Sequence, residues 1–188
     1  VTGTVDRAHL KKNDSACADD LLMLTKPLGI GIHTTAEKQG KLRAAHHGLA
    51  TELMCQPNQV GTLLAKLDGV NALTDVTGFG FAGHLIEMCQ GGSLSAIIDL
   101  DAIPELPVLD EYIAQGCVPG GTQRNFDALG DALPTLASRE LAVLCDPQTS
   151  GGLLVAVSPS TVEDVQRLLT EQRCPSAVVG SFIPNKAG

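Results

Sequence analysis

The sequence predicts a mixed fold in which short strands and helices pack together as an α/β sandwich. Short apolar runs bounded by Gly or Pro are typical of buried strands, and apolar residues that recur every three or four positions are typical of amphipathic helices. The two patterns alternate along the 188 residues, of which 44% are hydrophobic and 18% charged. Such a chain can bury a sizeable core, and the patterns leave the order of the strands open.

The N-terminal part of the chain is expected to pass from an irregular linker into regular structure. Residues 1–20 are polar and irregular. Residues 21–25 form a short apolar run that ends before Pro27, which predicts a buried strand. We expect residues 30–34 to continue as an extended segment. Residues 36–54 are rich in Ala, Lys and Leu, which favours a helix.

The middle of the chain alternates between helical and strand patterns. Asn58 is a suitable N-cap for a helix over residues 59–67, whose apolar residues share one face. Residues 72–74 are expected to form a strand that runs into a glycine-rich turn. The apolar spacing over residues 79–89 is helical again, and residues 95–100 are predicted to form a further strand.

The C-terminal part of the chain shows the clearest patterns. Ser160 is followed three residues later by Glu163, and this capping-box pattern predicts a helix over residues 160–171. Similar patterns predict helices over residues 109–115 and 123–133, and strands over residues 141–144, 153–157 and 177–182.

Composition excludes several kinds of partner. The formal net charge is -8, and nucleic-acid-binding proteins usually present a basic surface, so we expect no nucleic-acid partner. No apolar run reaches the roughly 18 residues needed to span a bilayer, so we expect a soluble protein without a membrane partner. The six cysteines are widely spaced and form no C-x-x-C pair, which argues against a closed zinc site and favours free thiols.

One segment that could carry chemistry is DVTGFG, residues 75–80, between a predicted strand and a predicted helix. Its glycines allow the backbone to approach a ligand, and the free N–H groups at a helix start favour an anion such as phosphate. Asp75 beside that anion could hold Mg²⁺, which typically binds one or two carboxylates together with phosphate and water. The alternative is that Asp75 only caps the helix and the glycines only permit the turn.

A second candidate segment is DPQTSGG, residues 146–152. Its two hydroxyls and two glycines could form an anion-binding concavity of backbone amides. The alternative is a hairpin-like connection between two strands, in which Asp-Pro starts the turn and Gly-Gly supplies positive φ angles.

Several single residues allow two interpretations. Lys26 follows a strand and could reach a phosphate, or it could be a solvated strand end. Residues 119–122 precede a helix that carries Asn125 in its first turn, and the same ambiguity applies. His84 could orient a loop, or it could make only a packing contact or one hydrogen bond. His46 and His47 are expected to be an exposed helical pair.

Three motifs in a fixed order resemble the selenophosphate synthetases, also called selenide, water dikinases. They are LTKPLG at residues 24–29, LTDVTGFG at residues 73–80 with GH and EM shortly after, and DPQTSGGLL at residues 146–154. The resemblance runs from about residue 1 to residue 183 and concerns the C-terminal, AIR-synthase-related domain of that family. It implies a three-layer α/β/α sandwich over residues 21–188, with residues 1–20 as a linker from an N-terminal domain.

The resemblance also implies an activity. Members of the family make selenophosphate from selenide, ATP and water and release AMP and phosphate, as Mg²⁺-dependent cytosolic homodimers. Asp75 matches the Mg²⁺ ligand that this domain contributes. Six further residues would lie near a phosphate or the cleft between domains: Thr77, Gly78, Gly80, Thr149, Ser150 and Gly151.

The parts of the family that perform the chemistry are not within these residues. The N-terminal domain of the family carries the catalytic Cys or selenocysteine, its lysine partner and the nucleotide loop, and Cys17 lacks the surrounding motif of that catalytic residue. We therefore expect no catalytic residue in this chain and no activity of the chain alone. The alternatives are another ATP-dependent enzyme of the AIR-synthase superfamily, or a non-catalytic paralogue that only dimerises.

Overall fold

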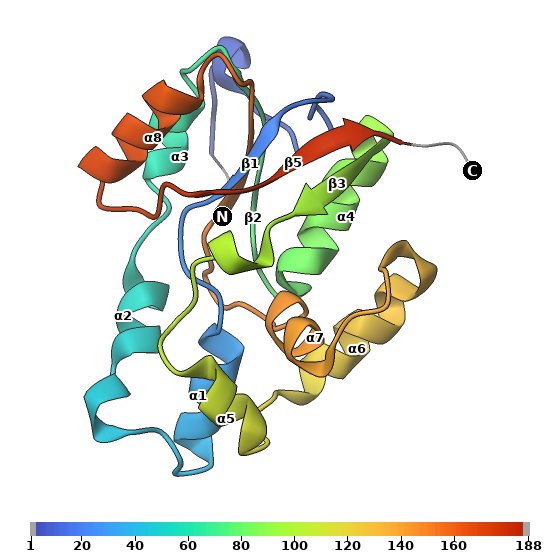
Figure 1. Cartoon of the computed structure of the whole chain (residues 1–188). Helices are drawn as coiled ribbons and strands as arrows, with labels where there is room; N and C mark the ends of the chain where they lie inside the picture. The colour runs from blue at the N-terminus through green and yellow to red at the C-terminus, as the bar shows by residue number, and fades with distance from the viewer. Residues whose placement is uncertain (1–2, 186–188) are drawn as a thin grey trace.

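A computed structural model describes residues 3–185, so residues 1, 2 and 186–188 of the predicted linker and domain lie outside the description. The five strands form one antiparallel sheet in the order β2-β4-β1-β5-β3 (Figure 1). Each strand overlaps a predicted one. The strands are β1 (Leu21–Leu24), β2 (Val70–Asp75), β3 (Leu94–Ile98), β4 (Leu153–Val157) and β5 (Val178–Pro184).

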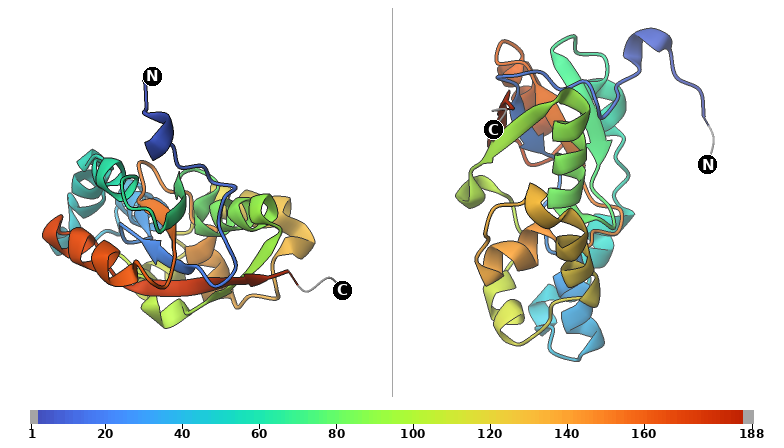
Figure 2. Two further views of the ribbon diagram at one scale, coloured as in Figure 1. Left: turned by 90° about the horizontal axis from the view of Figure 1, so that it is seen from above. Right: turned by 90° about the vertical axis from the view of Figure 1, so that its right-hand side faces the viewer.

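Helices cover both faces of the sheet, which confirms the predicted three-layer α/β/α sandwich (Figure 2). Side chains alternate along each strand, so Met23 faces one layer while Leu22 and Leu24 face the other. Met23 packs in the smaller core with α3 (Val60–Leu64) and α8 (Val162–Glu171). Leu22 and Leu24 pack in the larger core, to which α4 (Gly80–Gly92) contributes Phe81 and Met88.

The other helices lie together beyond one end of the sheet (Figure 1). They are α1 (Ile30–Lys38), α2 (Leu49–Cys55), α5 (Leu109–Ala114), α6 (Gly120–Leu129) and α7 (Ser138–Leu144). Within residues 3–185, no helix is both long and apolar enough to cross a membrane.

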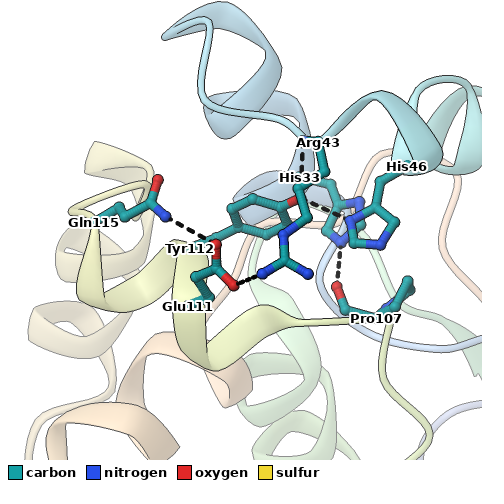
Figure 3. Close-up of polar contacts among 7 residues, drawn as sticks. All are labelled: His33, Arg43, His46, Pro107, Glu111, Tyr112 and Gln115. Carbon is teal, nitrogen blue, oxygen red and sulfur yellow. Dashed lines mark hydrogen bonds and ion pairs between the residues drawn. The ribbon is translucent and has the colours of Figure 1, made fainter.

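A polar cluster around the fully buried Tyr112 joins α1, α5 and the 3-10 helix Ala44–His46 (Figure 3). The Tyr112 hydroxyl accepts a hydrogen bond from the backbone N–H of Arg43 at 3.1 Å and contacts Nδ1 of His46 at 2.7 Å. The ring of His33 stacks on that of His46, with centroids 5.8 Å apart. The expectation of an exposed helical His46-His47 pair is therefore wrong for His46, which is half-buried against an aromatic ring.

The expectation of an extended segment over residues 30–34 is also wrong, because these residues begin α1. Gly29 at the N-cap has no side chain to bond the first N–H groups of the helix. The backbone N–H of Ile30 donates instead to Oε1 of Gln148 at 3.3 Å, and that of Gly31 to Oδ2 of Asp146 at 2.9 Å. Residues remote in sequence thus supply the cap that this helix lacks locally.

The predicted strand over residues 141–144 is likewise wrong, because these residues belong to α7. Its apolar residues Ala142, Val143 and Leu144 are buried, as in a strand, so the apolar run alone did not separate the two possibilities. The side chain of Glu140 accepts a hydrogen bond from the backbone N–H of Ala137 at 2.8 Å and stabilises the helix start.

Several predicted helices begin or end elsewhere. The helix expected over residues 36–54 is divided into three pieces. These are the end of α1 up to Lys38, the 3-10 helix Ala44–His46, and α2 from Leu49. Asn58 does not cap α3, because its Nδ2 donates to the backbone oxygen of Gly151. Ser160 does not cap α8, because its hydroxyl pairs with that of Ser158. The other predicted helices are present with shifted ends.

Residues 3–20 contain little regular structure beyond the 3-10 helix Arg7–His9. Part of the segment nevertheless packs along the free edge of β2. The backbone N–H of Leu73 donates to the backbone oxygen of Lys12 at 3.0 Å, and Nδ2 of Asn71 donates to the carboxylate of the buried Asp20.

Candidate active site wall

The three motifs from residues far apart in sequence meet at one end of the sheet. Asp75 is the last residue of β2 and pairs with Leu153, the first residue of β4. The backbone N–H of Val76 donates to the oxygen of Gly152 at 2.8 Å, and that of Thr25 to the oxygen of Leu153 at 3.0 Å. Because β4 lies between β1 and β2, residues 146–152 touch both of the other motifs.

Asp75 presents its carboxylate to solvent. The side chain is exposed and makes no hydrogen bond or ion pair within residues 3–185. It lies at an open depression that is also lined by residues from the N-terminal segment and from β4: Lys11, Lys12, Asn13, Asp14, Asn58, Leu73, Thr74 and Leu153. An unpaired carboxylate at a strand end is free to bind a cation, whereas a helix-capping Asp would bond the N–H groups of α4.

The turn over residues 75–80 points its backbone acceptors inward. The oxygen of Thr77 accepts from the backbone N–H groups of Gly80 and Gln148, both at 3.0 Å. The oxygen of Gly78 accepts from Nδ2 of Asn125 at 2.8 Å. Among the described residues, the N–H groups of positions 77, 78 and 79 have no acceptor. A turn with free donors at the start of a helix is suited to an anion.

Glycine is required where this turn meets residues 146–152. A Cβ at position 151 would lie 2.3 Å from the backbone oxygen of Val76, and one at position 152 would lie 2.5 Å from the backbone nitrogen of Lys26. Gly80 has a φ of 73°, and a Cβ there would lie 2.9 Å from the carbonyl carbon of Cys145. These close approaches let the three motifs form one surface.

The segment over residues 146–152 has an inner and an outer part. Asp146 and Gln148 are buried and hold the start of α1, and burial raises the pKa of Asp146 to about 7. Thr149 and Ser150 are exposed, and their hydroxyls make no hydrogen bond within residues 3–185. The hairpin alternative is wrong, because the segment follows helix α7 and not a strand.

The position of Lys26 contradicts both interpretations offered by the sequence. The side chain is only 4% exposed, and burial lowers its pKa. Its Nζ donates to the backbone oxygens of Leu53 at 3.1 Å, Gln56 at 2.8 Å and Ser150 at 2.7 Å. Lys26 is therefore neither a phosphate contact nor a solvated strand end. It binds the C-terminal carbonyls of α2 to the outer part of residues 146–152.

Comparison with known proteins identifies the family to which this chain belongs. The family described as "AIR synthase related protein, C-terminal domain" matches residues 18–188, which is nearly the whole chain. This chain belongs to that family. Solved structures with the same fold include the hydrogenase maturation protein HypE, with a TM-score of 0.67 at 18% identity over 96% of this chain and 49% of that chain. Thiamine-monophosphate kinase from Stenotrophomonas maltophilia K279a has a TM-score of 0.64 at 17% identity over 95% of this chain and 52% of that chain.

Curated relatives are much more similar in sequence. A selenide, water dikinase of Shewanella sp. (strain ANA-3) is 55% identical over 182 residues, which cover 97% of this chain and 52% of that protein. A selenide, water dikinase of Haemophilus influenzae (strain 86-028NP) is 52% identical over 184 residues, which cover 98% and 53%. This AIR-synthase-related domain thus spans about half the length of the curated relatives it matches.

The domain does not assemble a complete metal site from its described residues. Within residues 3–185, no group of three or more His, Cys, Asp or Glu side chains could hold a metal ion. A cation at Asp75 would therefore take its other ligands from water, from a phosphate or from outside this part of the chain. The cysteines are free thiols, as expected, and burial raises the pKa of Cys89 and Cys145 to about 11.

Sequence reasoning missed the residues that shape this surface of the domain. The sequence places Lys11 and Lys12 in a predicted linker, yet they line the depression beside Asp75. The sequence leaves the role of Asn125 open, whereas in the structure its Nδ2 donates to the backbone oxygens of Gly78 at 2.8 Å and Cys145 at 3.0 Å. No local pattern could have revealed these contacts, because the partners are distant in sequence.

Proposed function

We propose that the protein to which this domain belongs makes selenophosphate from selenide, ATP and water and releases AMP and phosphate. The identity of 52–55% to selenide, water dikinases over almost the whole chain supports this proposal. The observation that carries the role of the domain is the unpaired, exposed carboxylate of Asp75 beside the free N–H groups of residues 77–79. Together they offer a cation ligand and anion donors at one strand end.

In this proposal Asp75 binds Mg²⁺, which neutralises the charge of the ATP phosphates during phosphoryl transfer. The N–H groups of Thr77, Gly78 and Phe79 face a phosphate. Gly80 permits the turn and does not donate, because its N–H already bonds Thr77. Thr149 and Ser150 line the outer edge with their free hydroxyls, and Gly151 allows that edge to reach the turn.

The remaining groups would come from the other half of the protein. The nucleophilic Cys or selenocysteine, its lysine partner and the nucleotide loop belong to the N-terminal domain of the family, which would face the depression beside Asp75. We further propose that the whole protein is a cytoplasmic homodimer. The domain alone would supply one wall of the site and have no activity.

Asp75→Asn in the full-length protein tests the proposal. The variant keeps the shape of the side chain but loses its charge, so we expect selenide-dependent AMP formation to fall at least about a hundredfold. Asp68→Asn is a matched control, because Asp68 is also an exposed carboxylate without a partner in the described residues and lies outside the three motifs. Equal melting temperatures of Asp75→Asn and the unmodified protein would show that the fold of the variant is intact.

Three other results would contradict the proposal. Full AMP formation by Asp75→Asn would exclude the metal role. Conversion of ATP to ADP by the unmodified protein, without a need for selenide, would favour another ATP-dependent enzyme of the superfamily. No ATP turnover by the unmodified protein would favour a non-catalytic, dimerising paralogue.

A further inference from the structure

The hydroxyl of Thr77 is held from the protein side by the imidazole of His84. Thr77 lies in the turn between β2 and α4, two residues after Asp75, and His84 lies in α4. Oγ1 of Thr77 and Nε2 of His84 are 3.1 Å apart, which is a hydrogen-bond distance. His84 is only 8% exposed. The ring of Phe79, itself 66% exposed, meets it edge-on with centroids 6.0 Å apart.

The other ring nitrogen of His84 faces a carboxylate. Nδ1 is buried and has no hydrogen-bond partner within residues 3–185, but Oε2 of Glu87 lies 3.6 Å from it. Glu87 is anchored in turn, because Nδ2 of Asn13 donates to its Oε1 at 2.8 Å. The four side chains thus form a chain from the N-terminal segment to the turn that follows Asp75.

The nearby carboxylate of Glu87 favours the tautomer of His84 that carries its proton on Nδ1. A carboxylate only accepts hydrogen bonds, so it attracts an N–H at Nδ1 and repels a lone pair there. With the proton on Nδ1, Nε2 has a lone pair and must accept the hydrogen of the Thr77 hydroxyl. The hydroxyl of Thr77 then keeps only its oxygen lone pairs for other partners.

We propose that His84 is a positioning residue that turns the Thr77 O–H toward the protein, so that Thr77 presents only an acceptor to a bound ligand. The proposal rests on the proposed function in one respect, which is that a ligand occupies the turn after Asp75. In this proposal the turn offers a ligand two kinds of group, backbone donors and one side-chain acceptor. The free N–H groups of residues 77–79 bind the anionic part of the ligand, and the Thr77 oxygen accepts from an O–H donor beside it, either a hydroxyl or a water.

Nitrogen NMR of the full-length protein, labelled with ¹⁵N in histidine, tests the proton position without any assay of activity. We expect the ring of His84, assigned by comparison with His84→Gln, to show a protonated Nδ1 and an unprotonated Nε2. In Glu87→Gln the side-chain oxygen can still accept from Asn13, but its amide N–H groups now face Nδ1. That variant should lose the preference for a protonated Nδ1. A protonated Nε2 in the unmodified protein would overturn the proposal.

Kinetics of two His84 variants test the action through Thr77. Gln at position 84 can place an amide oxygen near the Nε2 position and accept the Thr77 hydrogen, whereas the shorter Asn cannot. We expect His84→Asn to lower kcat/KM for selenide-dependent AMP formation about tenfold, as for the loss of one aligned hydrogen bond, and His84→Gln to restore most of it. Melting temperatures of the two variants would identify a general loss of stability.

A double-mutant cycle with Thr77→Val separates positioning from a merely structural role. If His84 acts through the Thr77 hydroxyl, His84→Asn has no further effect on kcat/KM once that hydroxyl is absent. Equal losses with and without the hydroxyl would overturn the proposal. Absence of selenide-dependent AMP formation in the unmodified protein would instead contradict the proposed function, and the NMR result would still decide the proton position.

Discussion

The carboxylate of Asp146 accepts a hydrogen bond from the backbone N–H of Gly31, 115 positions earlier in the chain, at 2.9 Å. Space at this contact is tight, since a Cβ at position 31 would lie 2.4 Å from Oδ1 of Asp146. That Oδ1 atom is buried and has no partner within residues 3–185. One contact thus joins the segment next to the proposed site to α1, and it does so with a buried carboxyl group.

We expect the ionisation of Asp146 to reduce stability as the pH rises. Burial raises its pKa from 3.8 to about 7, so the folded protein binds this proton more tightly than the unfolded chain does. The free energy of unfolding should therefore fall between about pH 4 and pH 7, by at most about 4 kcal/mol, and then level off.

Asp146→Asn tests this expectation, because it keeps the shape of the side chain and cannot ionise. Its melting temperature should lose the decrease between about pH 5 and pH 7, a range in which ordinary carboxyl groups are already ionised. The exposed Asp131→Asn is the matched control and should keep the decrease. If the melting temperature of Asp146→Asn still decreased over this pH range, the decrease would have to come from another ionisable group.

Lys26→Met should destabilise the protein by about 3 kcal/mol or more, because it leaves three backbone oxygens without their charged donor. Met fills a similar volume, so lost packing contributes little. Chemical unfolding measures the difference. Lys66→Met is the control, since Lys66 is exposed and makes no hydrogen bond to the described residues. Equal stability of the two variants would show that the Lys26 contacts contribute nothing.

Gly151→Ala should separate the turn after Asp75 from residues 146–152. The added Cβ would lie 2.3 Å from the backbone oxygen of Val76, and backbone cannot move aside as a flexible side chain can. We expect a loss of about 1–3 kcal/mol in thermal unfolding. Gly78→Ala is the control, because a Cβ there meets nothing within 4 Å. A Gly151→Ala variant as stable as Gly78→Ala would contradict the close approach.

His46→Ala and His47→Ala should differ although the residues are adjacent. His46→Ala removes the contacts with the Tyr112 hydroxyl and the His33 ring, so we expect a destabilisation of about 1–2 kcal/mol. His47 is largely exposed, and its replacement should change stability by less than about 0.5 kcal/mol. Melting temperatures of both variants measure this difference. Equal losses of stability would exclude a special role for His46.

Local patterns in the sequence were sufficient for most of the fold. Apolar runs bounded by Gly or Pro marked all five strands, including β4 with both of its ends, because burial on both faces leaves a continuous apolar segment. Helical spacing marked α4 and α8. The same information could not distinguish α7 from a strand, because a run of four apolar residues, three of them buried, satisfies either pattern.

The candidate site was predicted only in part, and for a related reason. The order Asp, turn glycines, helix predicted a cation ligand beside a set of free N–H groups, and Asp75 is exposed at a strand end as that pattern requires. The role of that carboxylate remains a prediction. The sequence did not predict the buried position of Lys26 or the depression lined by Lys11 and Lys12.

The sequence by itself thus located the five strands of the sheet, the glycine-rich turns and the carboxylate that ends β2, because each depends on neighbours within a few residues, although it also predicted a strand where α7 lies. Only the tertiary structure decided that residues 30–34 are helical and that Lys26 is buried. The helix depends on Asp146 and Gln148 as its cap, and the lysine on the carbonyls of Leu53, Gln56 and Ser150. Buried polar groups need partners, and the antiparallel order β2-β4-β1 places these partners beside one another.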